Sequence, residues 1–186
     1  MRVTPTEIPE VLLVTPKVHR DERGYFLETY RADRYVEAGI PASFVQDNRS
    51  RSTKGVLRGL HAQRRRPQGK LVQVVSGRIF DVAVDLRRDS PTFRRWVGAT
   101  LTADGAEQLW VPPGFAHGFC VLSPTAVVEY KCTAPYDPAD EMRIAWDDHE
   151  IGVRWPVEAP VLSEKDRTAP RLDDWLDLLP WRAQAA

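Results

Sequence analysis

Apolar residues recur at every second position over much of this chain, and this period constrains the fold more than any other feature. In the segment 78–87, RIFDVAVDLR, Phe80 and its i+2 neighbours lie on one face of an extended chain, while Asp81 and Asp85 lie on the other. The segment 125–134 alternates in the same way. Further β-rich runs bounded by turn residues are 70–77, 96–101, 107–114 and 118–123. Short strands at this spacing predict an all-β sandwich or barrel.

Helical signals are confined to two short segments. Residues 31–39 are predicted to form one short helix that ends at a glycine, and residues 171–181 carry a second amphipathic pattern. The apolar residues of the second pattern, expected to pack on the barrel, are Leu172, Trp175, Leu178 and Leu179. The 15 prolines are spread along the chain and disfavour long helices. Because no linker, repeat or low-complexity segment occurs, residues 1–186 are predicted to form a single domain.

The charge balance argues against some classes of partner. Lys and Arg together number 26, as do Asp and Glu, so the chain has no net field that would attract nucleic acid or an anionic membrane. The segment 49–70 has no acidic residue and is locally basic, as either a solvated loop or an anion site. The sequence has no run of 18 apolar residues and no signal-peptide core, which predicts a cytoplasmic protein. Cys120 and Cys132 are too few for a disulfide framework and are expected to be reduced.

Two histidines raise the question of a metal site. His61 and His117 each lie at the end of a β-like run, and in a small barrel two such side chains can point into one cavity. A transition-metal site needs three or four ligands, commonly two histidines at positions x and x+2 together with a carboxylate. Position x+2 from His61 is Gln63, a poor ligand, and the other histidines, His19 and His149, lie in polar segments. The sequence therefore predicts no metal.

His61 is then either an ordinary core histidine or a general base, and the residues alone leave both interpretations open. Lys70 follows a glycine and heads an apolar strand, which would draw its amine toward the interior. Tyr130 lies in the middle of a strand on an apolar face, where its hydroxyl needs a partner. If these three side chains converge at the mouth of a barrel, they can move protons.

Eight sequence blocks carry a resemblance to a known family. They follow one another over about 160 residues: DERGYFLETY (21–30), FVQDNRS (44–50), GVLRGLHAQ (55–63), QGKLVQVVSGRIFDVAVDLR (68–87), SPTF (90–93), QLWVPPGFAHGF (108–119), EYKCTAPYDPADE (129–141) and LSEKD (162–166). In these blocks the chain resembles the dTDP-sugar epimerases, above all the dTDP-4-dehydrorhamnose 3,5-epimerase family. The resemblance implies an all-β, cupin-like jelly roll with a few short helices, a homodimer, and an enzyme without metal or cofactor.

The reaction that the resemblance implies is inversion at C3 and C5 of a dTDP-4-keto-6-deoxyhexose, through proton exchange next to the C4 ketone. His61, in RGLH, matches the family's base, and Asp166, in LSEKD, matches the carboxylate that orients it. Tyr130, in EYKCT, matches the acid that reprotonates the opposite face of the sugar. Lys70 matches the lysine whose charge stabilises the enolate oxygen.

The resemblance also assigns the residues that bind the nucleotide. Arg23 and Arg58 match contacts to the pyrophosphate, for which a guanidinium fork is suited. Gln46 and Asn48 match polar contacts to sugar and phosphate, and His117, in GFAHGF, matches a supporting residue of the pocket.

The base of the nucleotide is assigned a separate set. Phe26 and Tyr136 match the aromatic residues near thymine, and Glu28 matches a polar contact to it. In the family the DERG segment reaches into the neighbouring subunit's site, so residues 23–28 are expected to serve the partner chain.

Departures from the family pattern leave alternatives open. Ala62 follows the histidine where an aromatic residue is common, Pro135 replaces another, and the loop 64–66 is short and very basic. These changes surround the sugar pocket, so an enzyme that inverts only C3 or only C5 is a second hypothesis. A metal-dependent cupin oxygenase and a sugar-binding barrel without catalysis are alternatives of another class. A sugar 3,4-ketoisomerase is disfavoured because Gln63 stands where those enzymes have a second histidine.

Overall fold

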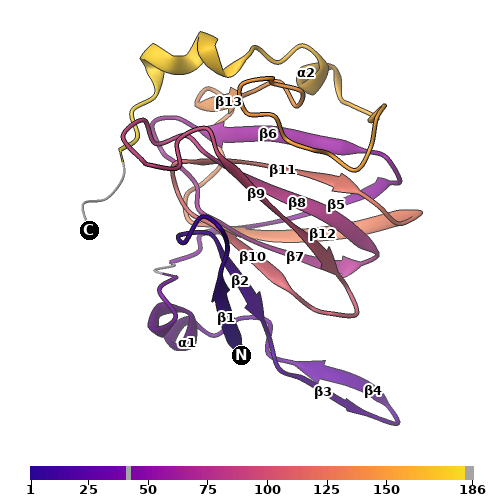
Figure 1. The fold of residues 1–186 in the computed structure, drawn as a ribbon. Helices are drawn as coiled ribbons and strands as arrows, with labels where there is room; N and C mark the ends of the chain where they lie inside the picture. Colours follow the sequence, from indigo (N-terminus) through magenta and orange to yellow (C-terminus); the bar gives the residue numbers. More distant parts are fainter. Residues whose placement is uncertain (41–42, 183–186) are drawn as a thin grey trace.

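The computed structural model describes residues 1–40 and 43–182 and contains two antiparallel sheets that face one another (Figure 1). The six-stranded sheet consists, in spatial order, of β1 (Arg2–Pro5), β2 (Leu12–Thr15), β10 (Gln108–Val111), β7 (Lys70–Ser76), β12 (Thr125–Cys132) and β5 (Gln46–Thr53). The five-stranded sheet consists of β13 (Glu141–Arg143), β6 (Leu57–Gln63), β11 (Phe115–Val121), β8 (Arg78–Asp85) and β9 (Trp96–Thr102). Every predicted strand segment is present, and the all-β, jelly-roll prediction is confirmed.

The core between the sheets is built from alternate residues of the facing strands. Val72 and Val74 of β7 contribute from one sheet, and Ile79 and Ala83 of β8 contribute from the other. Asp81 lies on this same inner face and is fully buried. The polar face that the alternation of 78–87 suggests is therefore turned toward the interior, not toward water.

The outer face of the five-stranded sheet is covered by the end of the chain. Residues 142–181 cross this face and bury a second apolar cluster that includes Val82 and Val84 (Figure 1). The segment 171–181 forms a 3₁₀ helix, η1 (Leu172–Leu178), instead of an α-helix. Leu172 is buried, but Leu178 is 49% exposed, so the prediction that the whole apolar stripe packs on the barrel is wrong for this residue.

The other predicted helix is confirmed as α1 (Ala32–Glu37), which lies on the outer face of the six-stranded sheet at one end. Its Tyr35 packs with Val14, Leu71 and Trp110. Just before it, β3 (Val18–Asp21) and β4 (Gly24–Leu27) form a hairpin that projects away from both sheets (Figure 1). A last short helix, α2 (Glu164–Arg167), lies next to β6.

Two neighbouring strands of the five-stranded sheet, β6 and β11, approach closely at a pair of glycines. A Cβ atom on Gly59 would lie 2.6 Å from the Cα atom of Gly118, so no side chain fits there. Gly59 also has φ +125°, which L-residues with side chains rarely adopt. The glycine of the RGLH motif therefore lets β6 pass close to β11, with Arg58 and His61 on either side of the contact.

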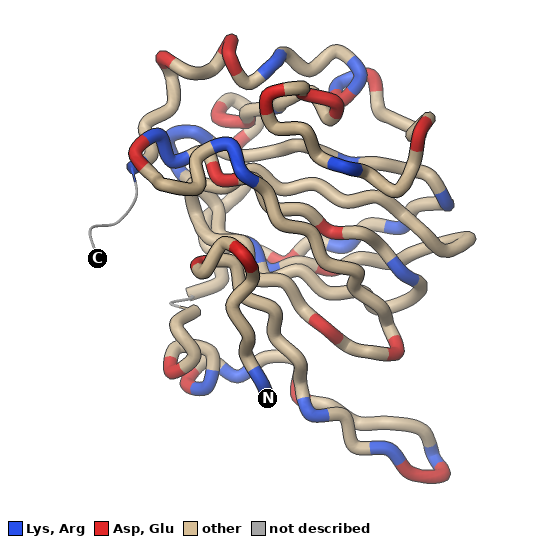
Figure 2. The backbone as a smooth tube through the Cα atoms, in the orientation of Figure 1, with Lys and Arg blue, Asp and Glu red and all other residues tan. Residues whose placement is uncertain are grey.

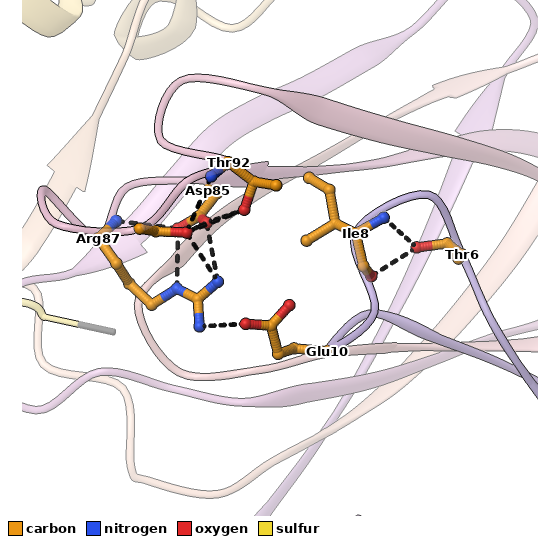
Figure 3. A network of polar contacts seen from close by, with 7 residues as sticks. Thr6, Ile8, Glu10, Asp85, Arg87 and Thr92 are labelled. Carbon is orange, nitrogen blue, oxygen red and sulfur yellow. Dashed lines mark hydrogen bonds and ion pairs between the residues drawn. The ribbon is translucent and has the colours of Figure 1, made fainter. Parts of the chain in front are cut away.

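A buried polar network surrounds Asp85 at the end of β8 (Figure 3). Asp85 accepts hydrogen bonds from the Arg87 guanidinium at 2.8 and 2.9 Å and from the Ser90 and Thr92 hydroxyls at 2.6 Å. Arg87 also donates to Glu10 at 2.8 Å, which ties the residues before β2 to the connection between β8 and β9. Burial opposes ionisation, but these donors outweigh it and lower the pKa of Asp85. The network is structural and lies outside the cavity that holds the candidate site.

Charged residues of both signs are interspersed along the chain, and both signs meet at the tip of the β3–β4 hairpin (Figure 2). This distribution agrees with the zero net charge of the sequence. Among the described helices, none is long and apolar enough to cross a membrane.

Candidate active site

The predicted catalytic residues line one cavity of about 350 Å³ between the two sheets. His61 comes from β6, Lys70 from β7, Tyr130 from β12 and Asp166 from α2. A second cavity of about 280 Å³ shares the first three of these residues. A larger hollow of about 1090 Å³, around Trp96, contains none of the predicted residues.

His61 and Asp166 form a hydrogen-bonded pair although 105 residues separate them in the chain. The distance between His61 Nε2 and Asp166 Oδ1 is 2.6 Å. The pair forms because Val161 makes a parallel bridge with Val56 just before β6, so that the following residues run beside this strand. The imidazole is 33% exposed, while the carboxylate is buried. One side of the histidine ring is therefore bonded to Asp166, and another side remains open to the cavity.

Ser163 completes the support of this carboxylate. Its hydroxyl donates to Asp166 Oδ2 at 2.8 Å, and its oxygen accepts from the Asp166 backbone N–H at 3.1 Å as the N-cap of α2. Burial would raise the pKa of Asp166, but the hydrogen bonds and charges from His61 and Ser163 outweigh it and lower this pKa. The carboxylate therefore stays ionised at neutral pH, as is required to stabilise an imidazolium.

Lys70 and Tyr130 lie on neighbouring strands at the other side of the cavity. Lys70 is buried, as the apolar strand that it heads predicts, and its Nζ lies 3.5 Å from the backbone oxygen of His61. Burial lowers the pKa of Lys70, against the opposing effect of Cys132, Asp81 and Glu141. Burial also raises the pKa of Tyr130, so the phenol keeps its proton at neutral pH and is able to donate it.

A second histidine–carboxylate pair lies deeper. His117 Nε2 is 2.8 Å from Asp81 Oδ1, and both side chains are buried. Burial lowers the pKa of His117, and the Asp81 charge acts in the opposite direction. The other carboxylate oxygen of Asp81 has no hydrogen-bond partner within the described part of the chain.

The arrangement gives a metal ion few ligands. His61 and His117 are directly opposite each other in the register of β6 and β11, but each bonds through Nε2 to its own carboxylate. Gln63, where a second histidine would stand, uses its side-chain amide to hold two loops. Within residues 1–40 and 43–182, no group of three or more His, Cys, Asp or Glu side chains is arranged to bind a metal ion.

Five predicted binding residues line the two cavities. Arg58 lines the first cavity and donates to Ser52 at 3.1 Å. Gln46, Asn48 and Tyr136 line the second, where Gln46 donates to Asn48 at 2.9 Å. His117 lines the first cavity at its buried end. The two cavities share His61, Lys70 and Tyr130, and the binding roles of these five residues stay predictions.

The remaining three predicted binding residues do not reach either cavity within this chain. Arg23 lies in the turn of the β3–β4 hairpin and pairs with Asp21, and Phe26 is 72% exposed on the same hairpin. Glu28 follows the hairpin and accepts a hydrogen bond from Arg34 at 2.9 Å. Their role in binding the nucleotide stays a prediction.

Two charged residues that line the first cavity, Glu141 and Lys165, were not among the residues predicted from the sequence. Glu141 lines both cavities, accepts a hydrogen bond from the Tyr136 hydroxyl at 3.3 Å and lies 3.7 Å from Lys165 Nζ. Both residues fall within the blocks that carry the family resemblance. No periodic pattern marks them, because β13 is only three residues long and α2 only four.

Comparison with known proteins identifies the family. The family model described as dTDP-4-dehydrorhamnose 3,5-epimerase matches residues 5–174. The chain belongs to the dTDP-4-dehydrorhamnose 3,5-epimerase family. Members of this family are isomerases, and the family and enzyme class expected from the eight sequence blocks are confirmed.

Individual relatives of this family support the same assignment. The chain is 53% identical to a dTDP-4-dehydrorhamnose 3,5-epimerase of Pseudomonas aeruginosa, over 94% of this chain and 97% of that protein. It is also 53% identical to the one of Neisseria gonorrhoeae, but spans only about half (51%) of the length of that relative. The crystal structure of dTDP-6-deoxy-D-glucose-3,5-epimerase from Legionella pneumophila, in complex with dTDP-4-keto-L-rhamnose, has a TM-score of 0.95 and 50% identity and covers 99% of both chains.

Proposed function

We propose that this protein inverts C3 and C5 of a dTDP-4-keto-6-deoxyhexose, as a dTDP-4-dehydrorhamnose 3,5-epimerase. The observation that carries the proposal is the hydrogen bond between His61 and Asp166. These two residues line one cavity together with Lys70 and Tyr130. The relatives' names give the substrate class, and the side chains supply a base, an acid and a cation. These are the three groups that exchange of a proton next to a ketone requires.

The proton bound to C3 or C5 is acidic because the resulting carbanion delocalises into an enolate at the C4 oxygen. His61 removes this proton, and Asp166 stabilises the imidazolium that forms. Lys70 places a desolvated positive charge at the enolate oxygen, an interaction of a kind whose removal costs about 10²–10³ in rate. Tyr130 returns a proton to the opposite face of the carbon, which inverts the centre.

The β3–β4 hairpin supports the proposal of a homodimer. Tyr25 and Phe26 are exposed on a hairpin that projects from the body, an unusual location for large apolar side chains unless a partner covers them. We assign Arg23, Phe26 and Glu28 to the nucleotide site of the neighbouring subunit. The cytoplasmic location expected from the sequence stays a prediction.

A mixing experiment tests this assignment. A variant with Arg23→Ala and Phe26→Ala has an intact His61 but a defective hairpin, and the variant His61→Ala has the reverse. Each is expected to be inactive alone. After unfolding and refolding together, the mixture is expected to reach about one quarter of the wild-type activity, since half of the dimers are mixed and each of these has one complete site. A mixture that stays inactive, or a chain that sediments as a monomer, contradicts the assignment.

The labelling experiment for the reaction itself uses a dTDP-4-keto-6-deoxyglucose substrate in deuterated water. Deuterium is expected at both C3 and C5, counted by NMR or mass spectrometry of the product. A protein that binds this substrate without incorporating any label contradicts catalysis and leaves the sugar-binding barrel. Oxygen consumption with this substrate that is lost after chelation and restored by iron supports the metal-dependent oxygenase instead.

Inversion of a single centre is the second candidate. A relative named dTDP-4-dehydrorhamnose 3-epimerase, from Streptomyces niveus, is 40% identical over 97% of this chain. Ala62 and Pro135 differ from the common family pattern close to the sugar pocket, and Ala62 lines the second cavity. Label at only one carbon of the same product identifies this activity.

A further inference from the structure

The turn that carries Tyr136 is held in an unusual way. Residues 134–137 follow β12, and Tyr136 is 47% exposed beside the second cavity. Four backbone groups of this turn, one on each successive residue, form hydrogen bonds with glutamine side chains. The glutamines come from three separate segments of the chain. We call Gln46, Gln63 and Gln68 the glutamine clamp.

Gln63 forms the centre of the glutamine clamp. Its amide nitrogen donates to the Pro135 oxygen at 3.1 Å, and its amide oxygen accepts from the Asp137 N–H at 2.7 Å. The same nitrogen donates to the Arg66 oxygen at 2.9 Å, which joins the basic loop to the turn. The side chain is 3% exposed, so all these bonds are shielded from water and costly to lose.

The other two glutamines complete the set from either side. Gln68 donates to the Ala134 oxygen at 2.7 Å. Gln46 accepts from the Tyr136 N–H at 2.8 Å, and its own nitrogen is already used by Asn48. The backbone on both sides of the Tyr136 side chain is therefore fixed, while the ring itself remains available to a ligand.

A turn of this kind has no strand pairing of its own to hold it. Without the clamp, the residues on either side of Tyr136 would have to be ordered when a ligand binds, and this ordering would weaken binding. The clamp residues and Tyr136 all line the second cavity, next to Asn48 and Glu141. The arrangement is pre-organised for a flat ligand that stacks on the Tyr136 ring.

We propose that Gln63 and Gln68 are positioning residues for the nucleotide, which hold Tyr136 at the geometry that binds the base of the dTDP-sugar. This inference rests on the proposed function, since it takes the ligand to be a dTDP-sugar. The two residues are expected to act on binding and not on the proton transfers, because the hydrogen bonds of their side chains go to backbone groups of the turn and of Arg66.

The test measures dTDP binding by calorimetry and epimerase kinetics on the same variants. Gln63→Met and Gln68→Met keep the length of the side chain and remove its hydrogen bonds. Each is expected to raise the Kd for dTDP and the KM for the substrate about tenfold, with kcat within about threefold of wild type. Gln73→Met is the matched control. Gln73 is a glutamine of β7 that bonds to Glu129 and Gln108 instead of this turn, and Kd is expected to stay within about twofold.

A double-mutant cycle separates positioning from general structure. In a Tyr136→Ala background the ring is already absent, so adding Gln68→Met is expected to change the Kd by less than about twofold. An equal tenfold effect in both backgrounds overturns the proposal, and so does a loss of kcat at unchanged KM. Gln68 makes a single clamp bond and is partly buried, so this variant carries the test if Gln63→Met does not fold. If the wild-type protein binds dTDP but does not epimerise the dTDP-sugar, the proposed reaction is refuted, while the positioning role of the glutamine clamp is still tested by the Kd values.

Discussion

The molecule contains two histidine–carboxylate pairs of similar geometry in very different surroundings. His61 and Asp166 are 2.6 Å apart, and His117 and Asp81 are 2.8 Å apart. The His61 side chain is 33% exposed to the cavity, whereas that of His117 is 7% exposed. The first pair joins a strand to a helix distant in sequence, and the second joins two adjacent strands of one sheet.

This difference separates a group that is able to exchange protons from one that holds a shape. A base must meet the substrate carbon on one side and keep a charged partner on the other, and the exposed ring of His61 satisfies both conditions. His117 is enclosed, and burial lowers its pKa, so it stays neutral at neutral pH. The hydrogen-bond geometry of a pair does not by itself make it catalytic. The exposure of the imidazole to the cavity decides which histidine is able to exchange a proton with the substrate.

The largest expected effect follows from removing the exposed imidazole. His61→Ala is expected to lower deuterium incorporation into the substrate by about 10²–10⁴-fold, the usual contribution of a positioned base. Binding of dTDP is expected to change by less than about tenfold, since the ring does not hold the nucleotide. Calorimetry and the deuterium assay give the two values. Unchanged exchange in this variant removes His61 from the mechanism.

Replacing the two carboxylates contrasts the pairs directly. Asp166→Asn is expected to lower kcat by about 10²-fold, since an amide neither stabilises an imidazolium nor selects the tautomer that is needed. Asp81→Asn is expected to lower kcat by less than about tenfold and mainly to reduce stability, by about 1–3 kcal/mol. Both variants are compared by steady-state kinetics and urea unfolding. If Asp81→Asn lowers kcat more than Asp166→Asn, the assignment of the two pairs is reversed.

Ser163 gives a smaller and more specific effect on the first pair. Ser163→Ala removes a donor that lowers the pKa of Asp166, so the carboxylate becomes more basic and holds the imidazole proton more tightly. The acid limb of the kcat profile is expected to move to higher pH, and kcat near neutral pH to fall about tenfold or less. Ser163→Thr retains a hydroxyl and serves as the control. An unchanged pH profile in Ser163→Ala shows that this hydroxyl only caps the helix.

The buried pair of His117 and Asp81 is expected to affect the pH dependence of the unfolding free energy. The pKa of His117 is lowered in the folded protein, so the unfolded chain binds more protons at acidic pH. Stability is therefore lost as the pH falls through the unfolded value of about 6.5, and the loss continues down to the folded pKa. Asp81, Lys70 and His61 act on His117 in the folded state.

The corresponding experiment compares urea unfolding at pH 7, 6 and 5. His117→Gln is expected to flatten the fall in unfolding free energy over this range. Asp166 does not contribute to this fall. Its pKa is lowered in the folded protein, so its stabilising effect is complete above the unfolded pKa of about 3.9 and decreases only at lower pH. His149→Gln, at a largely exposed histidine, is the control and is expected to leave the slope unchanged. Equal slopes for wild type and His117→Gln contradict the prediction.

Much of the fold could be predicted from local patterns. The period of two located the strands from β7 to β12, because alternation along a strand follows directly from the pleat of the backbone. The same pattern did not decide which face of β8 meets water. Asp81 and Asp85 are buried, and the opposite face of this strand is covered by the end of the chain. The segment 171–181 was expected to bury its whole apolar stripe, but Leu178 is exposed because a 3₁₀ helix turns its residues differently.

The sequence by itself determined the strand pattern, the family and the residue types available for proton transfer. Only the tertiary structure brought Asp166 to His61 across 105 residues, enclosed His117, and placed three glutamines around the Tyr136 turn. The physical reason is that periodicity records the local geometry of one strand, whereas a site is formed by contacts between strands. Such contacts depend on register, on bridges such as that of Val56 with Val161, and on which segments cover each face.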